Sequence, residues 1–193
     1  MSRTGIIILA AGNSSRLGRP KQLLPYRGKT LLTHVITEAL VAGLRTVVVT
    51  GAFYAEVSAS IREQPVDIIF NPAWEEGMAS GIVSGLSNML LLLPDVDAVI
   101  IAVCDQPFIS SALLLELVGT FNTSGKGIVA SAYADSVGAP VLFGRPYFKR
   151  LLELSGREGA KKLVRQHPDD LVLVDFPEGD RDIDTEEDAK SLE

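Results

Sequence analysis

Residues 5–25 read GIIILAAGNSSRLGRPKQLLP, and this stretch decides the fold class. Its first part, residues 5–11, is a continuous apolar run with three isoleucines, and it ends at Gly12. Such a run predicts a strand that is buried on both faces, as in the parallel sheet of an α/β protein. The second part gathers glycine, serine and basic residues directly behind this strand, which predicts a loop built for an anionic ligand.

The rest of the chain continues the alternation of strand and helix patterns. Further strands are expected at 45–50, 66–70, 97–103, 127–132, 139–143 and 170–175, and helices at 30–42, 52–62, 79–92, 110–121, 145–154, 158–166 and from 185 to the end. Strands separated by helices favour right-handed crossovers and a mostly parallel sheet with helices on both faces. With 193 residues, no internal repeat and no clear linker, we expect one domain over residues 1–193.

Local signals place several boundaries within this pattern. Thr30 and either Ser110 or Ser111 are the expected helix N-caps. Gly43 is expected just past the end of the first helix. Pro20 should hold the chain before Lys21 extended, and the segment QLLP that follows Lys21 should also be extended.

Composition excludes several classes of function. The chain has 18 basic and 24 acidic residues, a net charge of −6, and no basic block, so general nucleic-acid binding is not expected. Cys104 is the single cysteine, which excludes an internal disulfide. No apolar stretch approaches the roughly 20 residues that span a bilayer, and the run at 6–11 is too short for a signal peptide. We therefore expect a soluble cytoplasmic protein without membrane partners.

The loop after the first strand does not fit the two common phosphate-loop templates. Gly12 and Gly18 are separated by five residues and followed by Arg19, whereas a P-loop requires four residues and then lysine. The dinucleotide pattern G-x-G-x-x-G does not occur. The loop can still bind phosphate through turned backbone N–H groups, with Arg16, Arg19 and Lys21 adding charge-assisted hydrogen bonds. The alternative is an ordinary turn that carries solvated cations.

Three further segments follow strand ends or close the chain. CDQP, residues 104–107, follows a buried strand, so Asp105 is placed to hold Mg²⁺ beside a triphosphate, or else to cap a helix or form a turn. NPAWEEGMASG, residues 71–81, offers small residues and free N–H donors at a helix start; its Trp74 is more simply explained by packing than by stacking on a base. DIDTEED, residues 182–188, fits a helix that Thr185 caps and whose first turn is acidic. This helix start explains the three acidic residues after Thr185 well, but explains Asp182 and Asp184 less well.

Taken together, these motifs resemble a known family. The first loop, with its spacing from Gly12 to Lys21, resembles the signature of nucleotidyltransferases that load sugars, alcohols and pterins onto a nucleotide. NPAWEEGMASGIVSGL, VCDQPFIS, GAPVLF, LSGREGAKKLV and DIDTEED narrow the resemblance to the molybdenum cofactor cytidylyltransferases and their relatives, over residues 5–188. The resemblance implies a Rossmann-like three-layer sandwich of the nucleotide-diphospho-sugar transferase type.

The resemblance also implies a mechanism and its residues. CMP would pass from CTP to the phosphate of molybdopterin, with Mg²⁺ and release of pyrophosphate. The catalytic residues would be Arg16 at the β- and γ-phosphates, Lys21 at the α-phosphate, and Asp105 as a metal ligand, with Asp184 as the second ligand. The implied nucleotide-binding residues are Leu9, Ala10, Ala11, Gly12, Asn13, Ser14, Ser15, Lys21, Asn71, Gly77, Met78, Ala79 and Ser80. Delivery of the product to a molybdoenzyme or its chaperone would follow.

Two positions depart from the pattern of this family, and both lie in the half expected to meet the acceptor. Many relatives have histidine where this chain has Ala139, and an acidic residue where it has Arg157. Three alternatives therefore stay open. They are transfer of CMP to another small phosphorylated acceptor, such as a sugar-alcohol phosphate of isoprenoid synthesis; use of GTP by a molybdopterin guanylyltransferase; and a catalytically silent nucleotide-binding accessory protein. Cys104, His34 and His167 need no catalytic role in any of these readings.

Overall fold

The computed structural model describes residues 2–15, 17–133, 136–156, 159–183 and 187–188. Within these ranges a seven-stranded sheet has the order β5-β4-β1-β6-β8-β7-β9. Its strands are β1 (Thr4–Ala10), β4 (Arg45–Thr50), β5 (Asp67–Phe70), β6 (Ala98–Val103), β7 (Ile128–Tyr133), β8 (Ser136–Gly144) and β9 (Leu171–Asp175). β8 pairs antiparallel with both β6 and β7, and the other strand pairs are parallel. The predicted α/β class with a mostly parallel sheet is confirmed.

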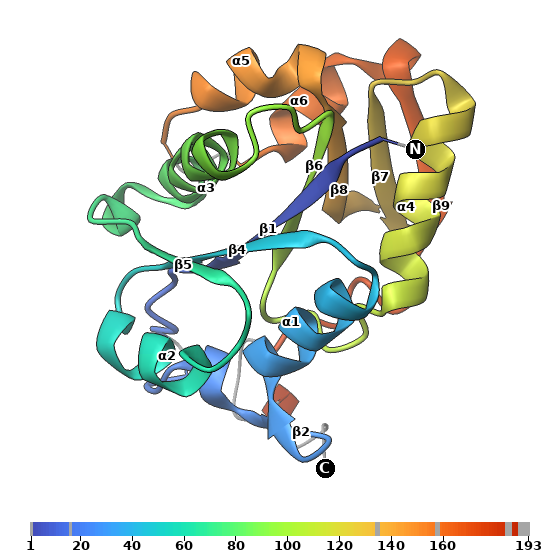
Figure 1. Ribbon diagram of the computed structural model, residues 1–193. Helices are drawn as coiled ribbons and strands as arrows, with labels where there is room; N and C mark the ends of the chain where they lie inside the picture. The colour runs from blue at the N-terminus through green and yellow to red at the C-terminus, as the bar shows by residue number, and fades with distance from the viewer. Residues whose placement is uncertain (1, 16, 134–135, 157–158, 184–186, 189–193) are drawn as a thin grey trace.

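Helices cover both faces of this sheet (Figure 1). They are α1 (Leu31–Val41), α2 (Tyr54–Ile61), α3 (Met78–Leu92), α4 (Ser111–Ser124), α5 (Phe148–Leu152) and α6 (Lys161–Gln166). Alternate residues of β1 face opposite ways: Ile6 and Ile8 pack in a core with α1, α2 and α4, while Ile7 packs in a second core with α3, α5 and α6. β1 is therefore buried on both faces, between the two helix layers of a three-layer sandwich, as its continuous apolar run predicted.

The predicted helix boundaries are confirmed where local chemistry sets them. The Thr30 hydroxyl accepts a hydrogen bond from the Thr33 N–H, and that of Ser110 accepts one from the Leu113 N–H, so both are N-caps. Gly43 follows α1 with φ +71°, a conformation that glycine adopts without strain. The helix predicted from residue 185 falls mostly outside the described residues.

The segment after Lys21 differs from the prediction of an extended chain. Lys21–Leu23 forms the 3-10 helix η1, and its last turn is closed by a hydrogen bond from the Leu24 N–H to the Lys21 carbonyl. A β-hairpin with a two-residue loop follows, in which β2 (Pro25–Tyr26) pairs with β3 (Lys29–Thr30). Arg27 and Gly28 both have positive φ, as the tight turn of such a hairpin requires. The prediction was wrong for Gln22 and Leu23, which lie in η1, because Pro20 restricts its own φ and the residue before it but leaves the turn after Lys21 free; Leu24 and Pro25 are extended as predicted.

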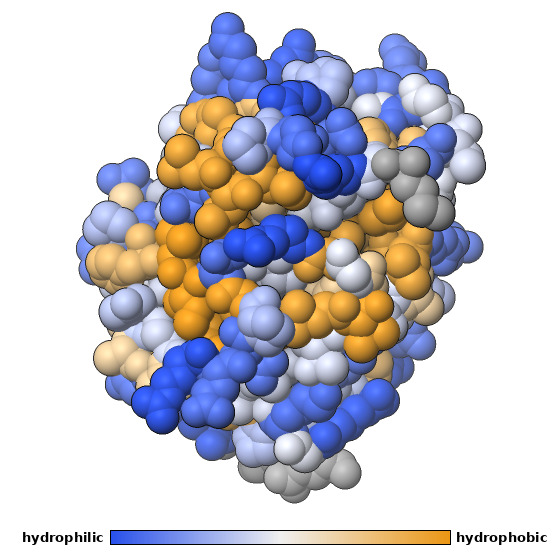
Figure 2. All heavy atoms as spheres, in the orientation of Figure 1, coloured by the Kyte–Doolittle hydropathy of each residue, from blue (hydrophilic) through white to orange (hydrophobic). Residues whose placement is uncertain are grey.

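The remaining 3-10 helices are η2 (Trp74–Glu76), η3 (Arg145–Tyr147) and η4 (Pro168–Asp170). Among the described residues, no helix combines the length and the apolar character that crossing a bilayer would need. Figure 2 shows hydrophilic side chains gathered at the top of this view, over α5 and α6, and along its lower margin, with hydrophobic surface between them. The strands β1, β6 and β4 end on the same side, so the loops that follow them are brought together.

Candidate active site

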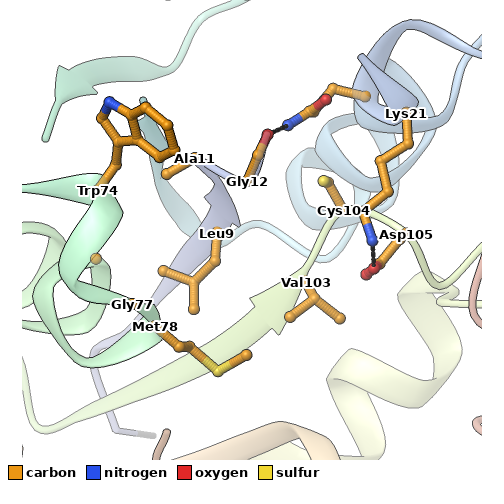
Figure 3. A pocket seen from close by; sticks show the side chains of 12 residues that line it. Leu9, Ala11, Gly12, Lys21, Trp74, Gly77, Met78, Val103, Cys104 and Asp105 are labelled. Atoms are coloured by element: carbon orange, nitrogen blue, oxygen red, sulfur yellow. Dashed lines mark hydrogen bonds and ion pairs between the residues drawn. The ribbon is translucent and has the colours of Figure 1, made fainter. Parts of the chain in front are cut away.

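A first cavity of about 250 Å³ lies at the carboxyl ends of β1 and β6. Its lining residues are Leu9, Ala11, Gly12, Lys21, Gln22, Trp74, Gly77, Met78, Gly81, Val103, Cys104 and Asp105. Leu9 and Val103 are neighbours in the β1–β6 register and lie between the two sides of the cavity. Figure 3 shows Trp74 and Met78 on one side, and Lys21 and Asp105 on the other. An apolar side of the cavity therefore faces a charged side, with Leu9 and Val103 between them.

The loop after β1 folds back on Ser14. The N–H groups of Leu17 and Gly18 both donate to the Ser14 carbonyl, and the Ser14 hydroxyl accepts a hydrogen bond of 3.1 Å from the Lys21 N–H. Ser14 itself has φ +49°, and Gly18 has φ +70°. The left-handed backbone conformations of Ser14 and Gly18 turn the loop back on itself. Lys21, seven positions after Ser14, therefore lines the same cavity as Gly12.

Gln22 is a site residue that sequence reasoning missed. Its side-chain amide donates to the Ala10 carbonyl at 2.9 Å and to the Gly12 carbonyl at 3.0 Å, and the residue is 1% exposed. These two bonds tie η1 to the end of β1 and fix the start of the loop. The signal available in the sequence was its position directly after Lys21.

The loop between β5 and α3 forms the apolar side of the cavity. Gly77 precedes α3 with φ +112° and ψ −170°, a conformation almost restricted to glycine. Asn71 donates to the Ser80 hydroxyl at 2.9 Å, and that hydroxyl contacts the carbonyls of Ala73 and Gly77, both at 2.8 Å. Asn71 and Ser80 thus hold the shape of this loop.

The charged side of the cavity is an ion pair between residues 84 positions apart. The Lys21 ammonium contacts Oδ2 of Asp105, and the two side chains are 17% and 15% exposed. The backbone of Asp105 is also held, because its carbonyl accepts a hydrogen bond of 3.0 Å from the Ile183 N–H. Ile183 packs in a small core with Leu17 and Leu24, which joins the C-terminal segment to the first loop.

The donor set at Asp105 fits a divalent cation that is bound together with phosphate. Its carboxylate lines the first cavity and already holds a cationic group, the ammonium of Lys21. Within the ranges that the structure describes, no three His, Cys, Asp or Glu side chains gather around one point. One or two carboxylates completed by phosphate oxygens is the set that Mg²⁺ prefers. Asp184, the predicted second ligand, lies outside the described residues.

Cys104 and His34 are both buried. Burial, and secondly the Asp105 charge, raise the pKa of the Cys104 thiol far above its usual value, so it stays protonated. His34 is buried, its Nε2–H donates to the Ile109 carbonyl at 3.1 Å, and burial lowers its pKa. A protonated thiol and a hydrogen-bonded, buried imidazole are poor candidates for a nucleophile or a base.

A second cavity of about 290 Å³ adjoins the first and shares Met78 and Val103 with it. Its other lining residues are Ile101, Gln106, Tyr133, Gly138, Ala139, Val141, Gly159, Ala160, Lys161 and Asp182. Burial, followed by the charges of Asp182 and Asp180, raises the pKa of Tyr133. Most of the residues that line this cavity are apolar, with one aromatic ring and a few polar groups. This composition is typical of a small-molecule site.

A bulge in β8 shapes the second cavity. In the pairing of β7 with β8 the register shifts between Ala130, opposite Val141, and Ser131, opposite Gly138. Ala139 and Pro140 fall in this interval, and Pro140 has no N–H to donate to a ladder. A strand was predicted only from residue 139 onward, whereas β8 begins at Ser136. The proline marks a bulge within the strand and not its beginning.

The structure brings six of the predicted nucleotide-binding residues to the first cavity, and these are Leu9, Ala11, Gly12, Lys21, Gly77 and Met78. Seven others do not line it, and these are Ala10, Asn13, Ser14, Ser15, Asn71, Ala79 and Ser80. Ala10 is buried in the core that holds Ile6 and Ile8, and Ala79 is also fully buried. Arg16 lies outside the described residues. Gln22, Gly81, Val103 and Cys104 line the cavity without having been predicted to bind nucleotide, and Trp74 lines it although packing was the favoured explanation.

Comparison with known proteins identifies a family whose members this chain resembles in sequence. The model of the MobA-like NTP transferase domain matches residues 6–171 of this chain. A nicotine blue oxidoreductase of Paenarthrobacter nicotinovorans is 32% identical to this chain over an alignment of 195 positions. The alignment covers 94% of this chain and 92% of that protein. A protein named probable molybdenum cofactor guanylyltransferase, of Bacillus cytotoxicus, is 31% identical over 125 residues, which cover 64% of this chain and 59% of that protein. This second match thus spans about three-fifths of the relative.

Solved structures match over the whole chain. The crystal structure of Rv0371c from Mycobacterium tuberculosis H37Rv is 30% identical in sequence, with a TM-score of 0.84, over 99% of this chain and 97% of that one. Its complex with manganese matches with a TM-score of 0.78 at 29% identity, over 99% of this chain and 98% of that one.

Proposed function

This chain belongs to the MobA-like NTP transferase family and is a nucleotidyltransferase, and we propose that it moves CMP from CTP to the phosphate of molybdopterin, releasing pyrophosphate. One observation carries the proposal most directly. Lys21 and Asp105, which chemistry at a triphosphate requires, meet at the wall of a cavity whose other side is apolar and shaped by glycine. Such a cavity suits a nucleotide, with its phosphates at the charged side and its base at the apolar side.

The nucleotide would lie across the first cavity. Its base would approach Gly77, Met78 and Gly81, where the missing or flexible side chains leave room for a flat ring. Its triphosphate would meet Lys21 and the backbone N–H groups of the loop after β1, with Arg16 as a further predicted contact. Trp74 also lines the apolar side, so ring stacking is part of this proposal.

Asp105 is the proposed ligand of a divalent metal, by preference Mg²⁺, with Asp184 as the predicted second ligand. A metal bound there supplies positive charge to the triphosphate and to the pyrophosphate that leaves. The manganese complex of the Rv0371c structure supports a divalent site in a relative of the same fold.

The reaction is an in-line displacement at the α-phosphorus. An oxygen of the acceptor phosphate forms the new bond, the bond to the β-phosphate oxygen breaks, and pyrophosphate carries away the electron pair. Lys21 would stabilise the charge that develops on the α-phosphate, and the loop would hold the β- and γ-phosphates in place. The chain needs no covalent nucleophile, which agrees with a buried, protonated Cys104.

The second cavity is the proposed acceptor site because it opens beside the first and shares Met78 and Val103 with it. Its apolar walls, together with Tyr133, suit a ring system better than a small sugar-alcohol phosphate. The family departure at Ala139 lies in this wall, so the acceptor is the part of the proposal that needs a direct test.

The test is pyrophosphate release from each of the four nucleoside triphosphates, with molybdopterin or a sugar-alcohol phosphate as acceptor. We expect turnover with molybdopterin, and a kcat/KM for CTP at least about tenfold above that for GTP, because a pocket that hydrogen-bonds a base edge rejects a mismatched base. A preference for GTP would replace the cytidine assignment. Binding of nucleotide without turnover, with any acceptor, would favour an accessory protein.

A second candidate function follows from a specific match. The relative that aligns over 94% of this chain bears the name of an oxidoreductase, whereas the guanylyltransferase match covers 64%. The discriminating assay incubates the protein with nicotine blue and with NADH or NADPH as reductant. We expect no oxidation of the nicotinamide above the rate without protein. Protein-dependent oxidation, without pyrophosphate release in the first assay, would replace nucleotidyl transfer with redox chemistry.

A further inference from the structure

Gln106, which lines the second cavity, has a side chain that the protein satisfies only in part. The residue is 2% exposed, and its amide nitrogen donates to the Gly179 carbonyl at 2.9 Å. Its Oε1 is buried, and no group in the described part of the chain donates a hydrogen bond to it. A buried carbonyl oxygen without a donor costs free energy, because its hydrogen bonds to water are lost on folding and not replaced. Gln106 therefore carries an acceptor that the chain itself does not use.

The orientation of this amide follows from its hydrogen bond to Gly179. A backbone carbonyl can only accept, so the NH₂ end of the Gln106 side chain must face it. A flipped amide would place two acceptor oxygens against each other, which excludes the alternative assignment of oxygen and nitrogen. Gly179 is held in turn, because its own N–H donates to the Phe176 carbonyl at 2.9 Å. The oxygen is therefore the end of the Gln106 amide that remains for a ligand.

The ring of Tyr133 lines the same cavity and is also fixed by glycine. A Cβ added at Gly138 would overlap the Tyr133 hydroxyl, and a Cβ added at Gly179 would overlap its ring, so the ring lies between these two glycines. The Tyr133 ring also packs edge-on against Phe176, with the ring centres 6.2 Å apart. Gly179 thus positions both the Gln106 amide and the Tyr133 ring, which preorganises this wall for a ligand.

The other polar groups of the second cavity limit the ligands that fit. Lys161 and Asp182 are exposed, Tyr133 is half-buried, and Gln106 alone among the described polar side chains of the lining is buried. The buried part of a ligand therefore meets apolar groups, an aromatic ring and one acceptor oxygen. A planar heterocycle with an N–H group matches this set. A sugar alcohol presents hydroxyl groups on every side, and most of them would stay unpaired there.

We infer that Gln106 is the specificity residue of the second cavity, where its Oε1 accepts a hydrogen bond from an N–H group of a planar heterocycle that lies against Tyr133. Rings whose nitrogens carry no hydrogen are rejected, because they leave the buried oxygen unpaired. Asp105, the preceding residue, lines the first cavity, so two adjacent residues after β6 serve two different ligands. This inference rests on the proposed function for its assignment of the second cavity to the acceptor.

The test compares two pteridines that differ only at their ring nitrogens, by isothermal titration calorimetry without nucleotide. Lumazine carries N–H groups at ring positions 1 and 3, and 1,3-dimethyllumazine carries methyl groups there. We expect the wild-type protein to bind lumazine at least about tenfold more tightly, because a site built to pair with N–H rejects an analogue that lacks it.

Gln106→Met separates the hydrogen bond from the bulk of the methyl groups. Methionine keeps the length and nearly the shape of glutamine but has no amide oxygen, so the preference for lumazine should disappear in this variant. Exclusion of the methyl groups by the cavity wall would instead persist. The substitution also removes the bond to Gly179, so urea unfolding is measured alongside. Gln106→Leu serves if the methionine variant does not fold.

The matched control is Gln64→Met. Gln64 lies between α2 and β5 and lines neither the first nor the second cavity. The control makes the same chemical change as Gln106→Met, and we expect it to keep the wild-type preference for lumazine.

Equal affinity of the wild-type protein for the two rings would overturn the inference, and so would the absence of lumazine binding. An undiminished preference in Gln106→Met would overturn it too, since the selection would then not depend on Oε1. Loss of the preference in Gln64→Met would have the same consequence. These results leave nucleotidyl transfer standing, because the assay contains no nucleotide. Failure of the proposed function would appear instead as absent pyrophosphate release in the wild-type protein.

Discussion

The two adjoining cavities are built in opposite ways. One short segment, residues 9–22, supplies five of the twelve residues that line the first cavity, and its Lys21 pairs with Asp105 on the charged side. The second cavity is assembled from β6, β7, β8 and α6 with Asp182, and most of its wall is apolar. Among the residues that the structure describes, only Met78 and Val103 line both cavities.

The difference corresponds to the ligands proposed for the two cavities. A triphosphate presents the same charge pattern whatever base it carries, so backbone N–H groups and a fixed ion pair suit it. An acceptor is recognised by shape and by a few polar groups, which side chains from several elements provide. Variants in the first cavity should therefore act on turnover, and variants in the second on acceptor affinity.

The largest effect is expected for Asp105→Asn. The amide has nearly the shape of the carboxylate, so the fold should be kept, but it cannot neutralise a metal, and turnover should fall about 10²- to 10³-fold. Pyrophosphate release measures the loss, and unchanged thermal unfolding shows that the fold is intact. Wild-type turnover in this variant, or full wild-type activity in excess chelator, would remove Asp105 from the site.

Lys21→Ala should come next and should lower kcat more than it raises KM for the nucleotide. A contact that strengthens as charge shifts at the α-phosphate counts mainly in the barrier, and its loss should cost about a hundredfold. Arg16→Ala is the partner variant, and we predict that it raises KM comparatively more. Steady-state kinetics at saturating acceptor separates the two. An unchanged kcat in Lys21→Ala would make Lys21 a ground-state anchor.

Lys161→Ala tests the second cavity and should have a smaller effect. Lys161 lines that cavity and donates to the Ser136 hydroxyl at 2.8 Å, but its side chain is exposed, so its charge is screened. KM for the acceptor should rise about fivefold, as for the loss of about 1 kcal/mol at an exposed charge, while KM for CTP stays unchanged. Lys162→Ala is the control, because this neighbour on α6 does not line the second cavity. Equal effects on both KM values would contradict the separation of the two cavities.

The smallest effect is on stability, away from both cavities. Tyr147 donates to Asp170 at 2.6 Å, and the Gly127 N–H donates to it at 2.9 Å; these bonds lower the pKa of Asp170, and burial raises the pKa of Tyr147 to about 12. A lowered carboxyl pKa stabilises the fold above the unfolded value of about 3.9, and this contribution disappears as pH falls through the folded pKa.

Asp170→Asn should therefore lose less stability than the wild type between pH 7 and pH 3. The urea midpoint measured at both pH values gives the comparison, and pyrophosphate release at pH 7 should be unchanged. A steeper loss of stability on acidification in the variant would contradict the assignment of this hydrogen-bonded pair.

Much of the fold could be predicted because its signals are local. The strand 45–50 was predicted with the bounds of β4, and the caps at Thr30 and Ser110 are set by residues within three positions. The apolar run after Gly5 required a strand with helices on both faces. The orientation of β8 could not be predicted, because it depends on which strands lie beside it and not on its own residues.

The site divides in the same way. The sequence by itself determined that a loop of glycine, serine and cations follows the first strand and that Asp105 follows a buried one, because spacing and periodicity carry both facts. The tertiary structure decided that Lys21 and Asp105 pair, that Gln22 clamps the loop, and that a bulge at Pro140 opens a second cavity. These contacts join residues distant in the sequence or depend on which strands lie side by side, and they exist only once the sheet has been assembled.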